Sequence, residues 1–269
     1  RVVMKTRRDF LKFTGTFALT AITIPMSFAK KSWNTESKRP NIILILTDDQ
    51  GYGDVGFHGN KVIRTPNLDQ FAREGVDFTR FYVAPVCSPT RAGIMTGRYH
   101  YRTGVTNVGS CGDRIKIGEV TIAEVLREAG YATAIYGKWH LGDNYPMRPQ
   151  DKGFDEAVVH TGCCLTPWFR NYPPGANYFD PYLFHNGKKK QYKGYCMDVY
   201  TDLAIEFMEK NVKSNKPFFI YLSTNTPHTP LNVSKEYSEP YIKMGLSQKM
   251  AEYYGTITNI DYNVGRLLS

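Results

Sequence analysis

Two nearly unbroken apolar segments, Asn41–Thr47 and Pro217–Ser223, constrain the fold of this chain more than any other feature. The first is rich in β-branched residues and is followed by charges and Gly51, a pattern typical of a strand covered on both faces. It predicts a central parallel strand. The second segment has the same character and predicts another buried strand of the same sheet.

Most of the remaining sequence alternates between helical and strand patterns. Residues Thr121–Glu124 form a capping box, and we expect the helix that it begins to end at Gly130. Apolar residues in Gln248–Leu268 recur every 3 or 4 positions, which is the stripe of a helix laid against a core. The other predicted elements are helices over Pro66–Glu74 and Met197–Val212 and strands over Val76–Val83 and Tyr131–Tyr136. Strands alternating with helices predict a doubly wound α/β fold, with a mostly parallel central sheet and helices on both faces.

Charge does not indicate a nucleic-acid partner. The chain of 269 residues has a formal net charge of +9, but residues 1–40 hold nine Lys or Arg against Asp9 and Glu36, so +7 of it lies there. The remainder is nearly balanced, which removes the electrostatic argument for binding DNA or RNA. The length suits one large α/β domain.

The basic N-terminal region has the features of an export signal. Thr6–Lys12 looks like a twin-arginine motif, and seventeen uncharged residues follow, Phe13–Ala29, which are too weakly apolar for a stable membrane span. We therefore expect residues 1–29 to be a removable leader recognised by the Tat translocon, residues 30–39 a linker, and the mature protein periplasmic or secreted. An uncleaved N-terminal anchor is the alternative.

Four further cysteines, Cys111, Cys163, Cys164 and Cys196, allow three disulfide pairings in an exported protein, and free thiols are equally open. Their spacing does not match zinc sites.

Acidic residues follow the first predicted strand directly. Asp48 and Asp49 fall at the carboxyl edge where open α/β sheets build their sites, and adjacent carboxylates favour a hard divalent cation between them. Such a pair alone is more often a turn with a helix cap. The Gln50–Asp54 segment that follows strengthens the metal interpretation.

Basic residues follow two other predicted strands. Lys138 and His140 are two residues apart, so in extended backbone their side chains lie on one face. His228 lies between Pro227 and Pro230, which predict a rigid turn. Each histidine taken singly is more often a structural hydrogen-bonding residue, but all of these side chains fall at predicted carboxyl ends of strands.

The segment Cys87–Arg91 combines a thiol, Pro89 and an arginine one helical turn from the thiol, with Thr96–Arg98 just behind. A lone cysteine is usually a small buried hydrophobe. Proline and arginine at this spacing suit a helix start that receives an anion.

Together these motifs resemble those of the type I sulfatases, the formylglycine-dependent, arylsulfatase-like family of the alkaline phosphatase superfamily. The matching segments are Pro40–Gly53, Cys87–Arg98, Gly130–Gly142 and Pro227–Pro230. The resemblance implies hydrolysis of sulfate esters. It also implies that a formylglycine-generating or sulfatase-maturating enzyme converts Cys87 to formylglycine, whose hydrated aldehyde is the nucleophile.

By the same resemblance the catalytic residues are Cys87, Arg91, Lys138, His140 and His228, and the metal ligands are Asp48, Asp49 and the converted Cys87. Arg91, Lys138 and the cation would bind the sulfate and offset developing charge. The cation is expected to be Ca²⁺, with Mg²⁺ as the alternative. An ordinary imidazole pKa of ~6.5 suits proton transfer. We expect His228 to protonate the leaving oxygen and His140 to serve the gem-diol.

The resemblance also implies an Asp-Asn pair of metal ligands and a further lysine beyond the last predicted helix. Asp261 and Asn263 lie within that helix, so we expect them to be structural. Residues 40–269 would then be the N-terminal portion of a sulfatase catalytic domain, lacking the C-terminal part and catalytically incomplete.

The substrate would be a sulfated small molecule or a sulfated polysaccharide. Residues 145–196 show no sustained period and are expected to form part of its rim. There, Trp168, Tyr172 and Tyr178 could stack on sugar rings, and Lys188–Lys190 is expected to be a solvated loop. Two alternatives stay open: a phosphodiester or phosphonate monoester hydrolase on the same scaffold, and a non-catalytic binding protein for sulfated glycans.

Overall fold

A six-stranded sheet forms the centre of residues 40–269 in the computed structural model, which describes residues 39–109, 113–162 and 178–269. Its strands occur in the order β1 (Ile42–Leu46), β6 (Phe218–Ser223), β2 (Ala132–Lys138), β3 (Glu156–His160), β4 (Tyr182–His185), β5 (Lys188–Gln191). The first four are mutually parallel, and β4 and β5 continue the sheet antiparallel. The predicted mostly parallel sheet is confirmed.

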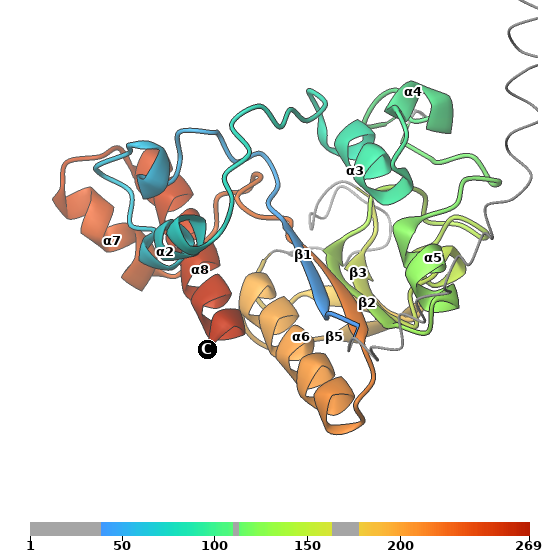
Figure 1. Cartoon of the computed structure of the whole chain (residues 1–269). Helices are drawn as coiled ribbons and strands as arrows, with labels where there is room; N and C mark the ends of the chain where they lie inside the picture. The colour runs from blue at the N-terminus through green and yellow to red at the C-terminus, as the bar shows by residue number, and fades with distance from the viewer. Residues whose placement is uncertain (1–38, 110–112, 163–177) are drawn as a thin grey trace, which may run out of the picture. The chain divides into compact units, whose positions relative to one another are not determined.

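Alternate residues of the parallel strands feed two separate cores. Ile43 and Ile45 of β1 pack on the side covered by α6 (Cys196–Lys213) and α8 (Gln248–Leu268). The opposite side is covered by α3 (Cys87–Thr96) and α5 (Ile122–Glu128), and Leu44 packs there (Figure 1). Period-two alternation with apolar residues on both sides therefore accounts for the helices on both faces.

Several local predictions are confirmed at the atomic level. In the capping box of α5, the Thr121 hydroxyl accepts from the Glu124 backbone N–H at 3.2 Å, and the Thr121 N–H donates to the Glu124 carboxylate at 2.8 Å. Asp261 accepts from the Leu68 N–H at 2.8 Å, and Asn263 donates to Asp198 at 2.7 Å, so both are structural.

The remaining helices complete the layers around the sheet. They are η1 (Gly56–His58), α2 (Pro66–Glu74), α4 (His100–Thr103), η2 (Pro149–Lys152) and α7 (Lys235–Lys243), of which α2 and α7 pack on α8. Within the described residues, no helix has the length and apolar character needed to cross a bilayer.

The first strand does not lie where its sequence predicted. In the described sheet β1 is an edge strand that pairs only with β6, and its residues are half-buried. An apolar run reports that both faces of a strand are covered, but it carries no information about hydrogen-bonding neighbours. The prediction of a central position was therefore wrong.

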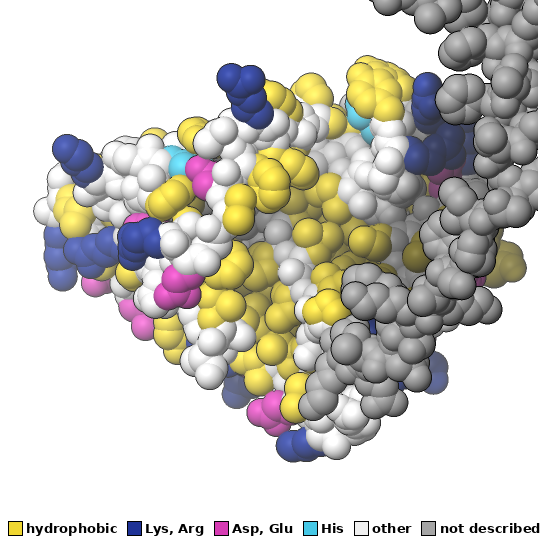
Figure 2. Space-filling view, in the orientation of Figure 1, with side chains coloured by type: hydrophobic (Ala, Val, Ile, Leu, Met, Phe, Trp, Pro, Cys, Tyr) yellow, Lys and Arg dark blue, Asp and Glu magenta, His cyan; other side chains and the backbone are white. Residues whose placement is uncertain are grey.

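The predicted strand over Val76–Val83 is also wrong. This segment joins α2 to α3 as an irregular chain, and it exposes large side chains such as Phe78 and Tyr82. Hydrophobic side chains gather across the middle of the face drawn in Figure 2. An alternating pattern produces a strand only where a neighbour pairs with the backbone, and none of the described strands does.

Residues 145–196 contain more regular structure than predicted. They supply β3 and a hairpin of β4 and β5, whose turn residues Asn186 and Gly187 have φ of 47° and 83°. Asn-Gly with two positive φ angles is a strong hairpin signal in the sequence. The Lys188–Lys190 run is exposed as expected, but on strand β5. Tyr178 is buried and donates to the His228 carbonyl at 2.9 Å, so the prediction that it stacks on sugars was wrong.

Other predictions lie outside the described residues. These are the export signal over 1–29, the linker up to residue 38, Cys111, Cys163, Cys164, Trp168 and Tyr172. Cys196 is a free buried thiol, and burial raises its pKa.

Candidate active site

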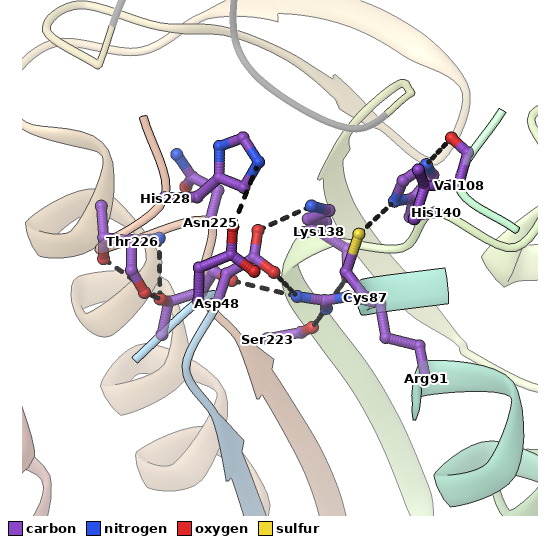
Figure 3. A network of polar contacts seen from close by, with 12 residues as sticks. Asp48, Cys87, Arg91, Val108, Lys138, His140, Ser223, Asn225, Thr226 and His228 are labelled. Carbon is purple, nitrogen blue, oxygen red and sulfur yellow. Dashed lines mark hydrogen bonds and ion pairs between the residues drawn. The ribbon is translucent and has the colours of Figure 1, made fainter. Parts of the chain in front are cut away.

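The carboxyl ends of β1, β6 and β2 meet at one edge of the sheet, and the first turn of α3 lies against them (Figure 3). Parallel strands place their ends together, so residues separated by up to 180 positions in the chain become neighbours here. Gly137 permits the close approach of β2 to β6: it has a φ of 114°, and a Cβ there would collide with the Ser223 carbonyl.

Asp48 is the centre of the charge network at this edge. Its carboxylate is 2 % exposed and accepts from Lys138 Nζ at 2.6 Å, while the Arg91 guanidinium lies 3.3 Å from its other oxygen. Burial by itself raises the pKa of this carboxyl, but the charges of Arg91 and Lys138 outweigh it, and the pKa is lowered. One buried carboxylate between two buried cations leaves a net positive charge, which favours an anionic ligand.

Arg91 is fixed by several hydrogen bonds in addition to its contact with Asp48. It donates to the Lys138 carbonyl at 2.9 Å and to the Ser223 hydroxyl, and it is 1 % exposed. Burial opposes its charge, yet Tyr221 and Asp48 raise the pKa of Arg91. The residue therefore anchors α3 to the strand ends while lying one helical turn from Cys87, as the i to i+4 spacing predicted.

Cys87 faces His140 across the site. The Cys87 Sγ lies 3.3 Å from His140 Nδ1, and His140 Nε2 lies 3.2 Å from the Val108 carbonyl. If Nε2 carries the proton and donates it to that carbonyl, Nδ1 is the acceptor that faces position 87.

The structure corrects two expectations about His140. Its φ is 55°, so it does not lie in extended backbone after Lys138. The two side chains therefore contact different partners, Lys138 beside Asp48 and His140 beside Cys87 (Figure 3). Burial, followed by the charges of Lys138 and Arg91, lowers the pKa of His140 to about 3, which replaces the expected value near neutrality. His140 is therefore a neutral imidazole at neutral pH, and it holds an added proton only weakly.

Asp49 and His228 form the other side of the site. Their side chains approach to 3.5 Å between Asp49 Oδ2 and His228 Nε2, with exposed fractions of 60 % and 22 %. His228 Nδ1 lies 2.7 Å from the Thr229 carbonyl. This pair is open to solvent, unlike Asp48 and His140.

A cavity of about 280 Å³ is lined by Asp48, Asp49, Cys87 and Arg91, whereas Lys138, His140 and His228 lie outside its lining. A larger hollow of about 440 Å³ lies along α3 and is lined by Phe81, Tyr82 and Tyr99, among others. It contains none of the predicted site residues. The smaller cavity is the candidate active site because the charges and the thiol converge there.

The carboxylates of Asp48 and Asp49 are the oxygen donors that Ca²⁺ and Mg²⁺ prefer. Within the part of the chain that the structure describes, no cluster of three His, Cys, Asp or Glu side chains could hold a metal ion. Since Ca²⁺ takes roughly six to eight oxygen ligands, these donors fit such an ion in kind and need others to complete its shell.

Sequence reasoning missed two residues at the same edge. Ser223 ends β6 and links Arg91 to Lys138, donating to the Lys138 carbonyl at 2.7 Å. His160 ends β3 beside Lys138 in the sheet register, is fully buried, and has its pKa lowered by that burial. The end of an apolar strand was a signal for Ser223, whereas His160 lies in the region without a period.

The sequence model of the Sulfatase family matches residues 40–269. The chain belongs to the sulfatase family. The family predicted from the motifs, within the alkaline phosphatase superfamily, is therefore confirmed.

Sulfatases from mammals are among its relatives. The chain is 33% identical over 255 residues to N-acetylgalactosamine-6-sulfatase of Canis lupus familiaris, covering 86% of this chain and 46% of that protein. It is 34% identical to arylsulfatase G of Mus musculus over 265 residues, covering 88% of this chain and 49% of that protein. The chain spans about half the length of the curated relatives it matches.

Solved structures agree with the fold. Ps i-CgsB in complex with k-i-k-neocarrahexaose superposes with a TM-score of 0.75 and 34% identity, covering 86% of this sulfatase chain and 54% of that chain. A phosphonate monoester hydrolase of Agrobacterium radiobacter superposes with a TM-score of 0.56 at 23% identity, over 85% of this chain and 58% of that one, and is similar in fold alone.

Proposed function

We propose that the protein containing this chain hydrolyses sulfate esters. The observation that carries the proposal is the buried arrangement in which Arg91 and Lys138 flank Asp48 beside the facing Cys87 and His140. A sulfate monoester carries one negative charge spread over its non-bridging oxygens. The net positive charge of this pocket complements that anion and can offset charge that develops during reaction.

We propose that Cys87 is the precursor of formylglycine, made by a formylglycine-generating or sulfatase-maturating enzyme. When present, the hydrated aldehyde supplies a hydroxyl oxygen that bonds to sulfur as the ester S–O bond breaks, and a second hydroxyl whose deprotonation expels sulfate and restores the carbonyl. Water is the net co-reactant, and the products are an alcohol and sulfate.

The chain's own residues would divide the proton transfers. His140 is placed to accept a proton through Nδ1, since this atom faces position 87. The partly exposed His228 protonates the leaving oxygen from the opposite side. Lys138 and Arg91 hold the sulfate oxygens, and the hydrogen bonds of Arg91 to the Lys138 carbonyl and to Ser223 keep its guanidinium from moving.

Asp48 and Asp49 would hold a divalent cation, for which we propose Ca²⁺ with Mg²⁺ as the alternative, together with the converted Cys87 and ligands beyond the described residues. Such an ion, when bound, would offset negative charge on the sulfate and lower the pKa of a nearby hydroxyl.

The substrate class is proposed from chemistry and relatives together. One relative is named N-acetylgalactosamine-6-sulfatase, and the solved structure of another is a complex with k-i-k-neocarrahexaose. We propose a sulfated glycan as substrate. We further propose Tat-dependent export to the periplasm or beyond, from the twin-arginine pattern of Thr6–Lys12.

The test compares matched aryl sulfate and aryl phosphonate substrates with the complete protein. Sulfate turnover that exceeds phosphonate turnover supports the proposal. Faster phosphonate turnover would indicate a phosphonate hydrolase. Tight binding of sulfated glycan without any turnover would indicate a binding protein.

A further inference from the structure

The turn after β1 has a backbone conformation that residues with a Cβ rarely adopt. Asp49 has a φ of 61°, in the left-handed region that disfavours residues with a Cβ. Such a conformation persists where surrounding contacts hold it. Because the Asp49 side chain is 60 % exposed, few contacts of its own fix its position. Its carboxylate is placed mainly by the backbone of this turn.

The hydroxyl of Tyr253, on α8, is the centre of the contacts that hold the turn. It donates to Asp54 Oδ2 at 2.7 Å, accepts from the Gly51 N–H at 3.3 Å, and lies 3.3 Å from the Asp49 carbonyl oxygen. Gly51 N–H also lies 3.0 Å from the same Asp54 oxygen, and the Asp54 N–H donates to the Gly51 carbonyl at 3.0 Å. One phenol oxygen therefore joins both ends of the turn to a helix about two hundred residues further along.

Gly51 leaves room for the Asp54 carboxylate in this arrangement. A Cβ at this position would lie 2.5 Å from Asp54 Oδ2, closer than real side chains approach. A side chain at position 51 would therefore displace the Asp54 carboxylate from its place beside the Tyr253 hydroxyl. Tyr253 also lines a hollow of about 260 Å³ together with Asp49 and His228, so these contacts border the candidate site.

We propose that Tyr253, acting with Asp54, is a positioning residue that fixes Asp49 for its divalent cation and for its pairing with His228. The inference rests on the proposed function. Groups that orient metal ligands commonly change metal affinity or activity by roughly 10-fold to 100-fold when they are removed.

The test is Tyr253→Phe in the complete protein, which removes one oxygen and keeps the ring. Tyr254→Phe is the matched control: its hydroxyl lies on the same helix and accepts at 3.1 Å from Asn60, whose amide donates to the Gly53 carbonyl and not to Asp49, Gly51 or Asp54. Calcium binding to metal-stripped protein is measured by titration calorimetry. We expect Tyr253→Phe to raise the dissociation constant about tenfold and Tyr254→Phe to leave it unchanged.

A second readout separates positioning from a general structural effect. Turnover of a sulfate ester by Tyr253→Phe should fall at limiting Ca²⁺ and return toward the wild-type value at saturating Ca²⁺. Gly51→Ala disturbs the same contacts through Asp54 Oδ2, and we expect the same loss at limiting Ca²⁺ and the same recovery at saturating Ca²⁺. This second variant keeps the test valid if one of the two folds poorly.

The outcomes separate this inference from the proposed function. If the wild type binds Ca²⁺ and cleaves sulfate esters, but Tyr253→Phe binds Ca²⁺ equally well, the inference is overturned and the function stands. An equal loss in Tyr253→Phe and Tyr254→Phe, with no recovery in excess Ca²⁺, also overturns it. A wild type without sulfatase activity overturns the proposed function itself.

Discussion

Replacing Lys138 by methionine tests the charge network at the centre of the site. The substitution keeps an unbranched side chain but removes the ammonium 2.6 Å from Asp48, where the two side chains are 0 % and 2 % exposed. Removal of one partner from a buried ion pair costs about 3–5 kcal/mol. Because Arg91 remains 3.3 Å from the carboxylate, we expect a loss near the lower limit, about 3 kcal/mol.

The pH dependence of this loss has a defined sign. In the wild type the pKa of Asp48 is lowered, so ionised Asp48 adds stability above its ordinary value of ~3.9 and loses it as pH falls through the lowered pKa. Without Lys138, the charge of Arg91 is the main effect left to lower the pKa of Asp48, while burial still raises it. The pKa of Asp48 therefore rises in the variant. Ionised Asp48 then destabilises the variant at neutral pH, and protonation on acidification relieves the penalty.

The assay is urea unfolding of the wild type and Lys138→Met at about pH 7 and about pH 4. The stability difference should be largest at the higher pH and smaller at the lower. Lys213→Met is the control, since Lys213 and Glu209 form an exposed pair at 3.5 Å, and we expect it to change little. Equal differences for Lys138→Met at both pH values would refute the reasoning about Asp48.

Two further substitutions test separate parts of the account. His140→Gln should lower turnover by about 10²-fold to 10⁴-fold. It should leave the acidic limb of the pH–rate profile in place, since a group with a pKa of about 3 cannot produce a limb near neutrality. Loss of that limb in the variant would contradict this expectation. Thr121→Ala should lower the unfolding free energy by about 1 kcal/mol in thermal or urea unfolding without altering turnover, because it breaks the capping box away from the site; unchanged stability would count against the cap.

The chemistry at the sheet edge could be predicted from the sequence because it depends on strand polarity. Once Asp48 and Lys138 are assigned to the ends of parallel strands, their meeting follows without knowledge of side-chain positions. The capping box and the stripe of Gln248–Leu268 are likewise local patterns, and the structure has both. Such features need only neighbours within a few residues.

Features that depend on distant partners could not be predicted in this way. The edge position of β1 depends on which strands pair with it, and the irregular path of Val76–Val83 reflects the absence of pairing among the described strands. The pKa of His140 depends on burial and on charges from two other elements. Tyr253 reads as one member of a helical stripe, and nothing in the sequence links it to Asp49.

The mass of the tryptic peptide that begins at Phe81 tests the central claim most directly. Conversion of the Cys87 thiol to an aldehyde should lower the peptide mass by roughly 18 Da in protein purified from a host that can mature it. A peptide lighter by this amount, in protein that cleaves sulfate esters, is the predicted result. Full sulfatase activity in protein whose Cys87 peptide retains the unmodified thiol mass would contradict the account.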